Sequence, residues 1–185
     1  MIERMDECGP PISVEDVENL EAHIGIRLPD DYRAFLLKHN GGRPTPDTYP
    51  IEGLANNPFG GVHFFFGIDD PVESCNLDWN FRIMNGRLPS NLFAIAGDAG
   101  MDLICLSLFG DDAGSVVFWD GYHEPSEPSY ANVYRIAESF PAFLESLRPL
   151  EHFMEQFVEQ FPEYKQHWEE IAETRRRNAE LEEES

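Results

Sequence analysis

The sequence has few cysteines and no long apolar run. Its three cysteines, Cys8, Cys75 and Cys105, are widely spaced and form no CxxC pair, which excludes a disulfide framework and favours a reducing compartment. No stretch approaches the roughly 20 apolar residues that a membrane span needs, and the opening MIERMDECGPP has no apolar signal segment. These absences predict a cytoplasmic protein that makes no membrane contact.

The sequence also lacks the common catalytic motifs. There is no P-loop, GxSxG, HExxH or GxGxxG pattern, and the six histidines are scattered without metal-ligand spacing. The turns GDAGMD and GDDAG carry Asp98, Asp102, Asp111 and Asp112 but lack the regular spacing of a calcium loop. Tight turns favour aspartate in any case. We therefore expect no catalytic residue, no cofactor and no metal.

Positive charge is scarce. Thirteen lysines and arginines stand against thirty-five acids, a net charge of −22, which argues against nucleic acid as a direct ligand. From Pro44 to Tyr134 the only cations are Arg82 and Arg87, set against thirteen acids. Such a field of one sign attracts a basic protein partner. Solubility alone is an equally good explanation of the overall acidity.

The hydrophobic pattern predicts helices at both ends of the main domain. Ser13-Val-Glu-Asp16 has capping-box spacing, and Val17, Leu20 and Ile24 follow on one helical face. The stretch LPDDYRAFLLKHNGG predicts a second helix over 29–39, whose stripe of Tyr32, Phe35 and Leu36 should back a sheet. A further helix is expected at 139–148. Residues 70–85 form a weaker helical pattern.

Strands are predicted between these helices. The stretch 43–61 is rich in Pro, Gly and Asn and reads as a long surface loop with a short strand near 49–51. Short apolar runs separated by Gly and Asp indicate strands at 62–68, 91–96, 102–108, 115–119 and 133–136. The expected fold is α+β, an antiparallel sheet of about five or six strands flanked by N-terminal and C-terminal helices.

Residues 150–185 differ from the rest of the chain. Phe153, Phe157 and Phe161 form a one-sided aromatic ridge, and after Pro162 a helix with a thin apolar face of Tyr164, Trp168 and Ile171 is expected, frayed at its end. We predict a main domain over residues 1–149 and a helical extension over residues 150–185. The extension either packs on the domain or projects from it.

Three stretches resemble the SMI1/KNR4 family, also called the SUKH superfamily. ISVEDVENLEAHIGIRLPDDYRAFLLKHNGG is similar to its N-terminal signature, LPSNLFAIAGDAGMDLICLSLFGDDAGSVVFWDGYHE to its strand block, and VYRIAESFPAFLESL to its closing helix. The likeness covers roughly residues 12–148. The family's usual glycine pair is replaced by Ala99-Gly100 followed by Met101, and residues 150–185 lie beyond the family core.

The resemblance implies an α+β fold with no catalytic residues to carry over. It also implies the role common among bacterial members, which is an immunity protein that binds and neutralises a cognate toxin, often a nuclease. Eukaryotic relatives are linked to the regulation of cell-wall synthesis. A short stand-alone domain resembles the bacterial kind.

The leading hypothesis is therefore a non-enzymatic binding module whose acidic face occludes a toxin. Its candidate partner-binding residues are rim charges and aromatic anchors: Asp98, Asp102, Asp111, Asp112, Asp120, Tyr122, Glu124 and Tyr130. An alternative is a small-molecule or peptide-binding regulatory domain with a pocket between the aromatic strand and the flanking helices. A third is an enzyme that uses His123 beside Glu124, although no nucleophile is marked nearby.

Overall fold

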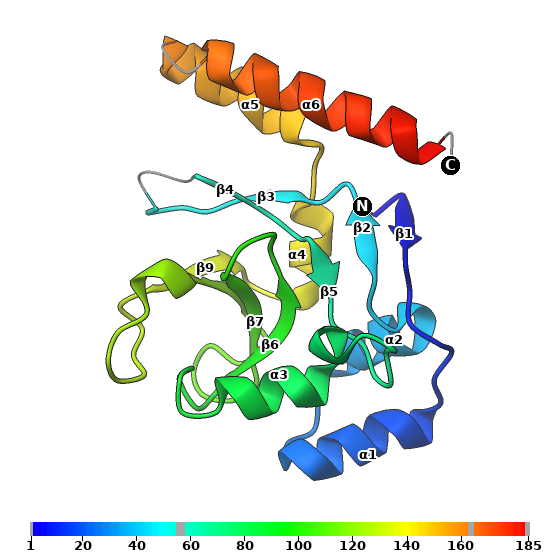
Figure 1. Ribbon diagram of the computed structural model, residues 1–185. Helices are drawn as coiled ribbons and strands as arrows, with labels where there is room; N and C mark the ends of the chain where they lie inside the picture. The colour runs from blue at the N-terminus through cyan, green and yellow to red at the C-terminus, as the bar shows by residue number, and fades with distance from the viewer. Residues whose placement is uncertain (1, 55–57, 163–164, 184–185) are drawn as a thin grey trace. The chain divides into compact units, whose positions relative to one another are not determined.

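The computed structural model describes residues 2–54, 58–162 and 165–183 (Figure 1). Contacts divide the chain into two compact units, Met1–Leu147 and Arg148–Ser185, and the boundary predicted at 149/150 stays a prediction. No helix in the described part of the chain is long and apolar enough to cross a membrane.

The first unit is built around a five-stranded antiparallel sheet, which confirms the predicted α+β fold. Its strands lie in the order β5-β6-β7-β8-β9, with bounds Phe64–Phe65, Leu92–Gly97, Leu103–Ser107, Val116–Trp119 and Val133–Ala137. Every residue of β7 and β8 is buried, whereas the edge strand β9 is half-exposed. Both faces of the central strands are therefore covered, which explains their continuous apolar runs.

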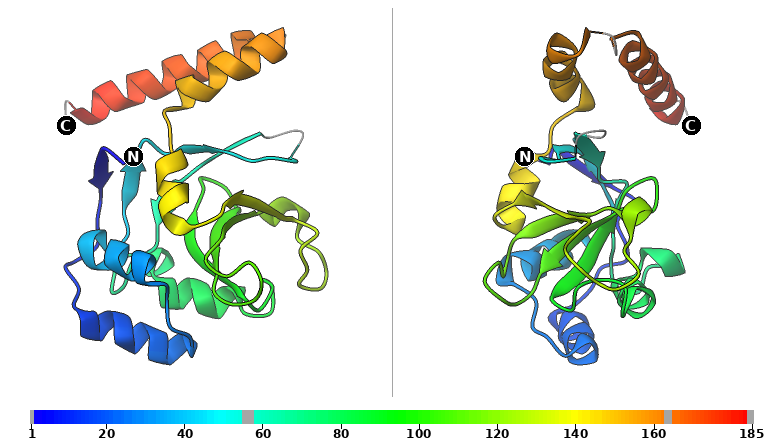
Figure 2. Two further views of the ribbon diagram at one scale, coloured as in Figure 1. Left: turned by 180° about the vertical axis from the view of Figure 1, so that it is seen from behind. Right: turned by 90° about the vertical axis from the view of Figure 1, so that its left-hand side faces the viewer.

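Helices cover the two faces of the sheet (Figures 1 and 2). On one face, the ring of Phe65 in β5 lies 4.9 Å from Phe35 of α2 (Asp30–His39) and 6.2 Å from Phe140 of α4 (Phe140–Ser146). On the opposite face, which carries Phe64 and Trp119, α3 (Leu77–Met84) lines one groove with these two rings. The ring of Phe81 in α3 lies 6.2 Å from that of Phe93 in β6. The predicted packing of the 29–39 helix behind the sheet is confirmed.

The capping signals at the N-terminal helices are also confirmed. Helix α1 (Val14–Ile24) begins with a complete capping box between Ser13 and Asp16 and ends at Gly25 in the left-handed conformation, with φ 77°. Arg33 of α2 forms an ion pair with Glu21 of α1, and Glu21 also accepts a hydrogen bond of 2.7 Å from the Leu28 backbone N–H. These contacts hold α1 and α2 together across a short connection.

The sequence Asn40-Gly41-Gly42 does more than end α2. Asn40 is 2 % exposed and adopts the left-handed conformation, with φ 48°. Its side-chain Nδ2 donates to the carbonyls of Pro10 and Ile68, both at 2.8 Å, and its Oδ1 accepts from the Ile68 N–H at 2.7 Å. A Cβ at Gly41 would lie 2.6 Å from the Phe65 carbonyl oxygen. The motif therefore joins the N-terminal segment, α2 and the β5 region.

Three local predictions need correction. In the predicted loop 43–61, the short strand expected near 49–51 is present as β3 (Thr48–Pro50), which pairs with β4 (Phe59–Gly61), but a further strand, β2 (Arg43–Thr45), pairs with β1 (Arg4–Asp6). The predicted strand 62–68 is only two residues long, since Gly67 turns aside to pair with Asn76. The helix predicted from residue 70 begins at Leu77, after a 3-10 turn, η1, over Glu73–Cys75.

Asn76 explains the late start of α3. Its side-chain Oδ1 accepts from the Asp70 N–H at 2.8 Å, while Nδ2 donates to the carbonyls of Asp70 and Val72 at 2.9 and 3.1 Å. These bonds stabilise a compact 69–75 loop at the expense of a helical path.

The second unit consists of α5 (Leu150–Gln160) and α6 (Lys165–Glu183). Leu150 and Met154 of α5 pack with Ile171 and Ala172 of α6 in a small apolar cluster. The rings of Phe157 and Phe161 lie 4.9 Å apart along the predicted ridge. Tyr164 and the predicted frayed end at 184–185 lie outside the described residues, and so does the Trp168 side chain.

Candidate functional site

The predicted partner-binding residues fall at two opposite ends of β7. Asp98 and Asp102 lie in the turn before this strand, and Asp111 and Asp112 lie in the turn after it. Five residues of extended chain separate the two turns by about 16 Å. The sequence-predicted site is therefore two surfaces, which we describe in turn.

The first surface is built from two turns that interlock. The Asp102 carboxylate accepts a 2.8 Å hydrogen bond from the Gly121 N–H, in the turn that follows β8. Asp98 accepts from the Gly100 N–H at 2.6 Å and from the Asp102 N–H at 3.3 Å. A Cβ at Gly121 would collide with the Met101 carbonyl oxygen, so the two backbones are in direct contact. Both turns are therefore held in one shape.

The carboxylates of this surface lie close enough to affect one another. Partial burial raises the pKa of Asp102, and the nearby charges of Asp98 and Asp120 raise it further, against the lowering effect of the Gly121 hydrogen bond. Within the described residues, no lysine or arginine forms an ion pair with any of the three. A cation brought by a partner would relieve this repulsion.

Two members of the predicted set are placed differently from the expectation. Asp120 is 5 % exposed and is not a rim charge, because its carboxylate caps the 3-10 turn η2 (Gly121–His123) and lies 2.7 Å from His123 Nδ1. Glu124 accepts two hydrogen bonds from Arg87, at 2.8 and 2.5 Å, which lower the pKa of its carboxyl group. His123 therefore pairs with Asp120, and the predicted pairing with Glu124 is wrong.

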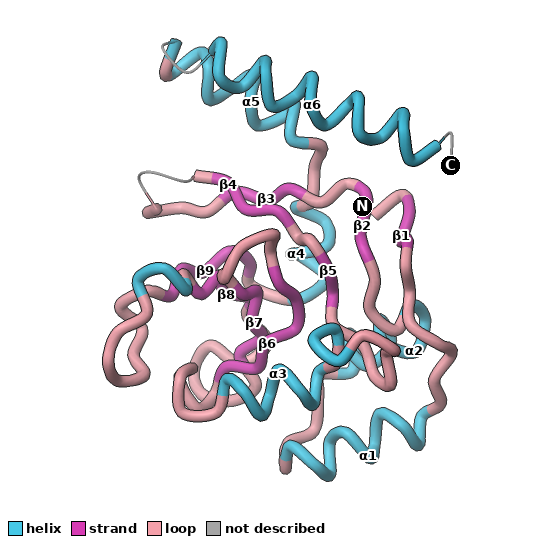
Figure 3. Tube along the Cα trace, viewed as in Figure 1, coloured by secondary structure: helices cyan, strands magenta, loops and turns pink. Residues whose placement is uncertain are grey.

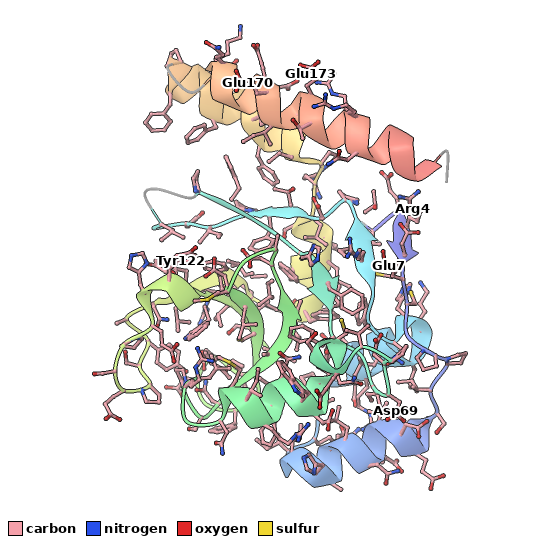
Figure 4. All side chains as sticks on the ribbon, viewed as in Figure 1. Arg4, Glu7, Asp69, Tyr122, Glu170 and Glu173 are labelled. Carbon is pink, nitrogen blue, oxygen red and sulfur yellow. The ribbon has the colours of Figure 1, made fainter. Side chains whose placement is uncertain are left out.

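Two exposed apolar side chains accompany these charges. Tyr122 is 78 % exposed and Met101 is 61 % exposed. Tyr122 belongs to the long connection between β8 and β9, which is loop except for the short helix η2 (Figure 3). Its side chain lies far from Glu7 and Asp69 (Figure 4). Sequence reasoning named Tyr122 but gave Met101 no role. The available signal was an apolar residue inside the polar turn GDAGMD.

The second surface is smaller. Asp111 is exposed, and Asp112 accepts a 3.1 Å hydrogen bond from the Ser107 hydroxyl. Ser107 accepts in turn from Asn91 Nδ2 at 2.9 Å, and the Tyr130 hydroxyl donates to Asn91 Oδ1 at 2.6 Å. This chain of bonds positions Tyr130, which keeps 51 % exposure.

A groove of about 1240 Å³ adjoins the first surface. It lies where the regulatory-domain hypothesis expected a pocket, beside the aromatic strand and α3. Phe64 and Phe66 line it, while Phe65 between them packs on the opposite face, as alternation along a strand requires. The groove lining comes from segments far apart in the sequence: 7–10, Arg43, 63–66, 69–75, 79–87, 97–103 and Trp119.

The groove carries an excess of negative charge. Its two arginines are already engaged, Arg43 with Glu7 at 3.2 Å and Arg87 with Glu124. The guanidinium of Arg87 also lies 5.7 Å from the centre of the Trp119 ring. The acids Asp69, Asp70, Asp98 and Asp102 line the same groove, and none of them forms an ion pair within the described residues. No metal-binding group of histidines, cysteines or acids occurs in the described part of the chain.

Comparisons with known proteins find one matching family model and two similar proteins. The model of the SMI1 / KNR4 family (SUKH-1) matches residues 11–146. The chain is 32 % identical over 148 residues to the SPbeta prophage-derived uncharacterized protein YokK of Bacillus subtilis (strain 168), covering 72 % of this chain and 73 % of that protein. It is 26 % identical over 112 residues to the uncharacterized protein YnaB of the same organism, covering 43 % of this chain and 78 % of YnaB.

Proposed function

We propose a function from one premise: the chain belongs to the SMI1/KNR4 (SUKH-1) family. Members of this family are generally immunity proteins without catalytic activity. We infer that this protein binds a cognate toxin and neutralises it by covering its active or substrate-binding face. In this proposal the protein neither makes nor breaks covalent bonds, and it uses no cofactor.

The observation that carries the proposal is the uncompensated acidity of the surface around β7. From Leu88 to Tyr134 there are seven acids and no lysine or arginine. Asp98 and Asp111, at the two ends of the strand, have no cationic partner within the described residues. A nuclease toxin must be basic where it contacts phosphates, so an acidic inhibitor is attracted to that face and competes with the substrate.

The test uses the cognate toxin domain, which is to be sought among the genes adjacent to the gene for this chain. We expect the purified proteins to form a complex that abolishes toxin activity, and association to slow about 10-fold between about 50 and 200 mM salt. At either salt concentration, the double variant Asp98→Asn/Asp111→Asn should associate more slowly than wild type. The control Glu15→Gln/Glu18→Gln removes the same charge from an exposed face of α1 and should behave as wild type. A complex that forms at the same rate in every variant and at both salt concentrations would rule out electrostatic occlusion.

The groove supports a second candidate function, a regulatory domain that binds a small molecule or a peptide. Its location beside β5 and α3 matches what such a domain requires. A metabolite panel that raised the melting temperature of the wild-type protein, and left that of the groove variant Ile83→Lys unchanged, would favour this candidate.

A further inference from the structure

We propose that the groove between β5, α3 and the 98–102 turn is the docking site for a projecting segment of the toxin. The segment carries apolar side chains flanked by lysine or arginine. This inference rests on the proposed function and adds to it the place of contact and the chemistry of the contacting segment.

The first argument is where apolar side chains are exposed. Val72, Ile83 and Met101 are 55 %, 42 % and 61 % exposed, and all three line this one groove. They come from three separate segments, the 69–75 loop, α3 and the 98–102 turn. Single exposed apolar residues are ordinary on protein surfaces, but a group of them around a concavity indicates a binding site. Folding alone gives no reason to bring these three together.

The second argument is the size and the floor of the groove. Its floor is aromatic: Phe64 and Phe66 are 9 % and 7 % exposed, and Trp119 is 1 % exposed. The volume of about 1240 Å³ exceeds the roughly 300–1,000 Å³ of sites that enclose a small molecule. A segment of polypeptide with several side chains fills such a space better than a metabolite does.

The third argument is charge. Both arginines of the groove are neutralised within the chain, by Glu7 and Glu124. Asp69 and Asp70 on one wall and Asp98 and Asp102 on another remain without a cationic partner among the described residues. An apolar floor between two acidic walls is complementary to apolar side chains that have basic neighbours.

The fourth argument is that the walls are already formed. Asn40 holds Pro10 and Ile68 in place, and the Asn76 side chain holds the 69–75 loop. The Asp102 bond to Gly121 holds the turn that carries Met101. A preformed site loses little conformational entropy on binding, so less of the contact energy is lost to ordering the protein.

The test compares two exposed apolar residues that receive the same new charge. Ile83→Lys places an ammonium group in the groove, whereas Leu37→Lys places one at a 38 % exposed position on α2, outside the groove and away from both acidic turns. We expect Ile83→Lys to weaken toxin binding by roughly 30-fold or more, as loss of an anchor residue does. Leu37→Lys should stay within about 3-fold of wild type. Melting curves and near-ultraviolet circular dichroism check that both variants are folded.

A second arm does not depend on the toxin. Peptides are selected from a random library on the wild-type protein and then tested on Ile83→Lys. We expect selected sequences that combine apolar residues with lysine or arginine and that lose binding to this variant. If wild type and Ile83→Lys neutralise the toxin equally well, the groove assignment is wrong and the proposed function is unaffected. If wild type leaves the toxin active but binds library peptides that depend on the groove, the proposed function is wrong instead.

Discussion

Replacing Asn40 by alanine should destabilise the first unit more than a typical substitution does. Three side-chain hydrogen bonds disappear, to Pro10 and twice to Ile68, each worth about 1 kcal/mol. Alanine must also adopt the left-handed conformation that Asn40 has at φ 48°, which costs a further 1 kcal/mol or so. The expected loss is about 4 kcal/mol, against a total stability of about 5–15 kcal/mol for most domains.

A glycine at the same position separates the two contributions. Asn40→Gly loses the same three bonds but tolerates the left-handed backbone, so it should lose about 3 kcal/mol and be more stable than Asn40→Ala by about 1 kcal/mol. Lys38→Gln, on the exposed face near the end of the same helix, should stay within about 0.5 kcal/mol of wild type.

The measurement is urea unfolding followed by fluorescence, with Trp168→Phe as background so that only Trp79 and Trp119 of the first unit report. The midpoint should fall while the dependence on urea concentration stays unchanged. The corresponding fall in melting temperature is roughly 10 °C. An Asn40→Ala variant within about 1 kcal/mol of wild type, or one more stable than Asn40→Gly, would refute the reasoning.

Three further predictions concern the acidic turns and the cysteines. Because the folded state raises the pKa of Asp102 above its usual value, wild type loses stability as the pH rises from about 4 through that raised pKa. Asp102→Asn, which keeps an oxygen for the Gly121 N–H, should therefore melt at a higher temperature than wild type at pH 7. This difference in melting temperature should shrink as the pH is lowered, and a difference that stayed constant would contradict the reasoning. Gly121→Ala forces a Cβ against the Met101 carbonyl and should cost about 1–3 kcal/mol in urea unfolding, whereas Gly61→Ala, with open space around the new Cβ, should cost much less; equal losses would be evidence against the interlocked turns. Thiol titration should label the exposed Cys8 quickly and the buried Cys105, whose pKa is raised by burial, only on unfolding; prompt labelling of Cys105 in the folded protein would contradict its burial.

Elements that depend on local signals were predictable from the sequence. The capping box at Ser13 and the apolar stripe of Val17, Leu20 and Ile24 act within one or two helical turns, and the structure contains both. The three central strands are likewise local apolar runs between turn residues, and their positions agree with the structure within one residue at every end. For α1 and these strands, residues close together in the sequence were enough to predict the structure.

Elements that depend on distant partners were not predictable. Strand β2 forms because Arg4–Asp6 pairs with Arg43–Thr45. The residues of the 43–61 stretch alone do not predict this pairing. The pattern Asn40-Gly41-Gly42 predicts the end of a helix, but its contact with Ile68 depends on the tertiary fold. The lining of the groove could not be predicted from the sequence either, because its walls come from segments that meet only in the folded chain.

Burial of polar residues was the weakest part of the site prediction. Asp120 looks like any other aspartate beside a glycine, and only the fold reveals that it caps a turn and is 5 % exposed. The prediction that the remaining members of the set contact a partner stays a prediction. What the structure adds is their division between the two ends of β7.

The walls of the groove have a consequence for how recognition diverges over generations. Backbone hydrogen bonds and the buried amide of Asn76 determine the path of these segments, while Val72 and Met101 extend outward and take no part in the core. Point mutations at such positions exchange one recognition chemistry for another at almost no risk to foldability. Under the docking proposed above, a few such substitutions would let the protein follow changes in its toxin while the scaffold stays the same.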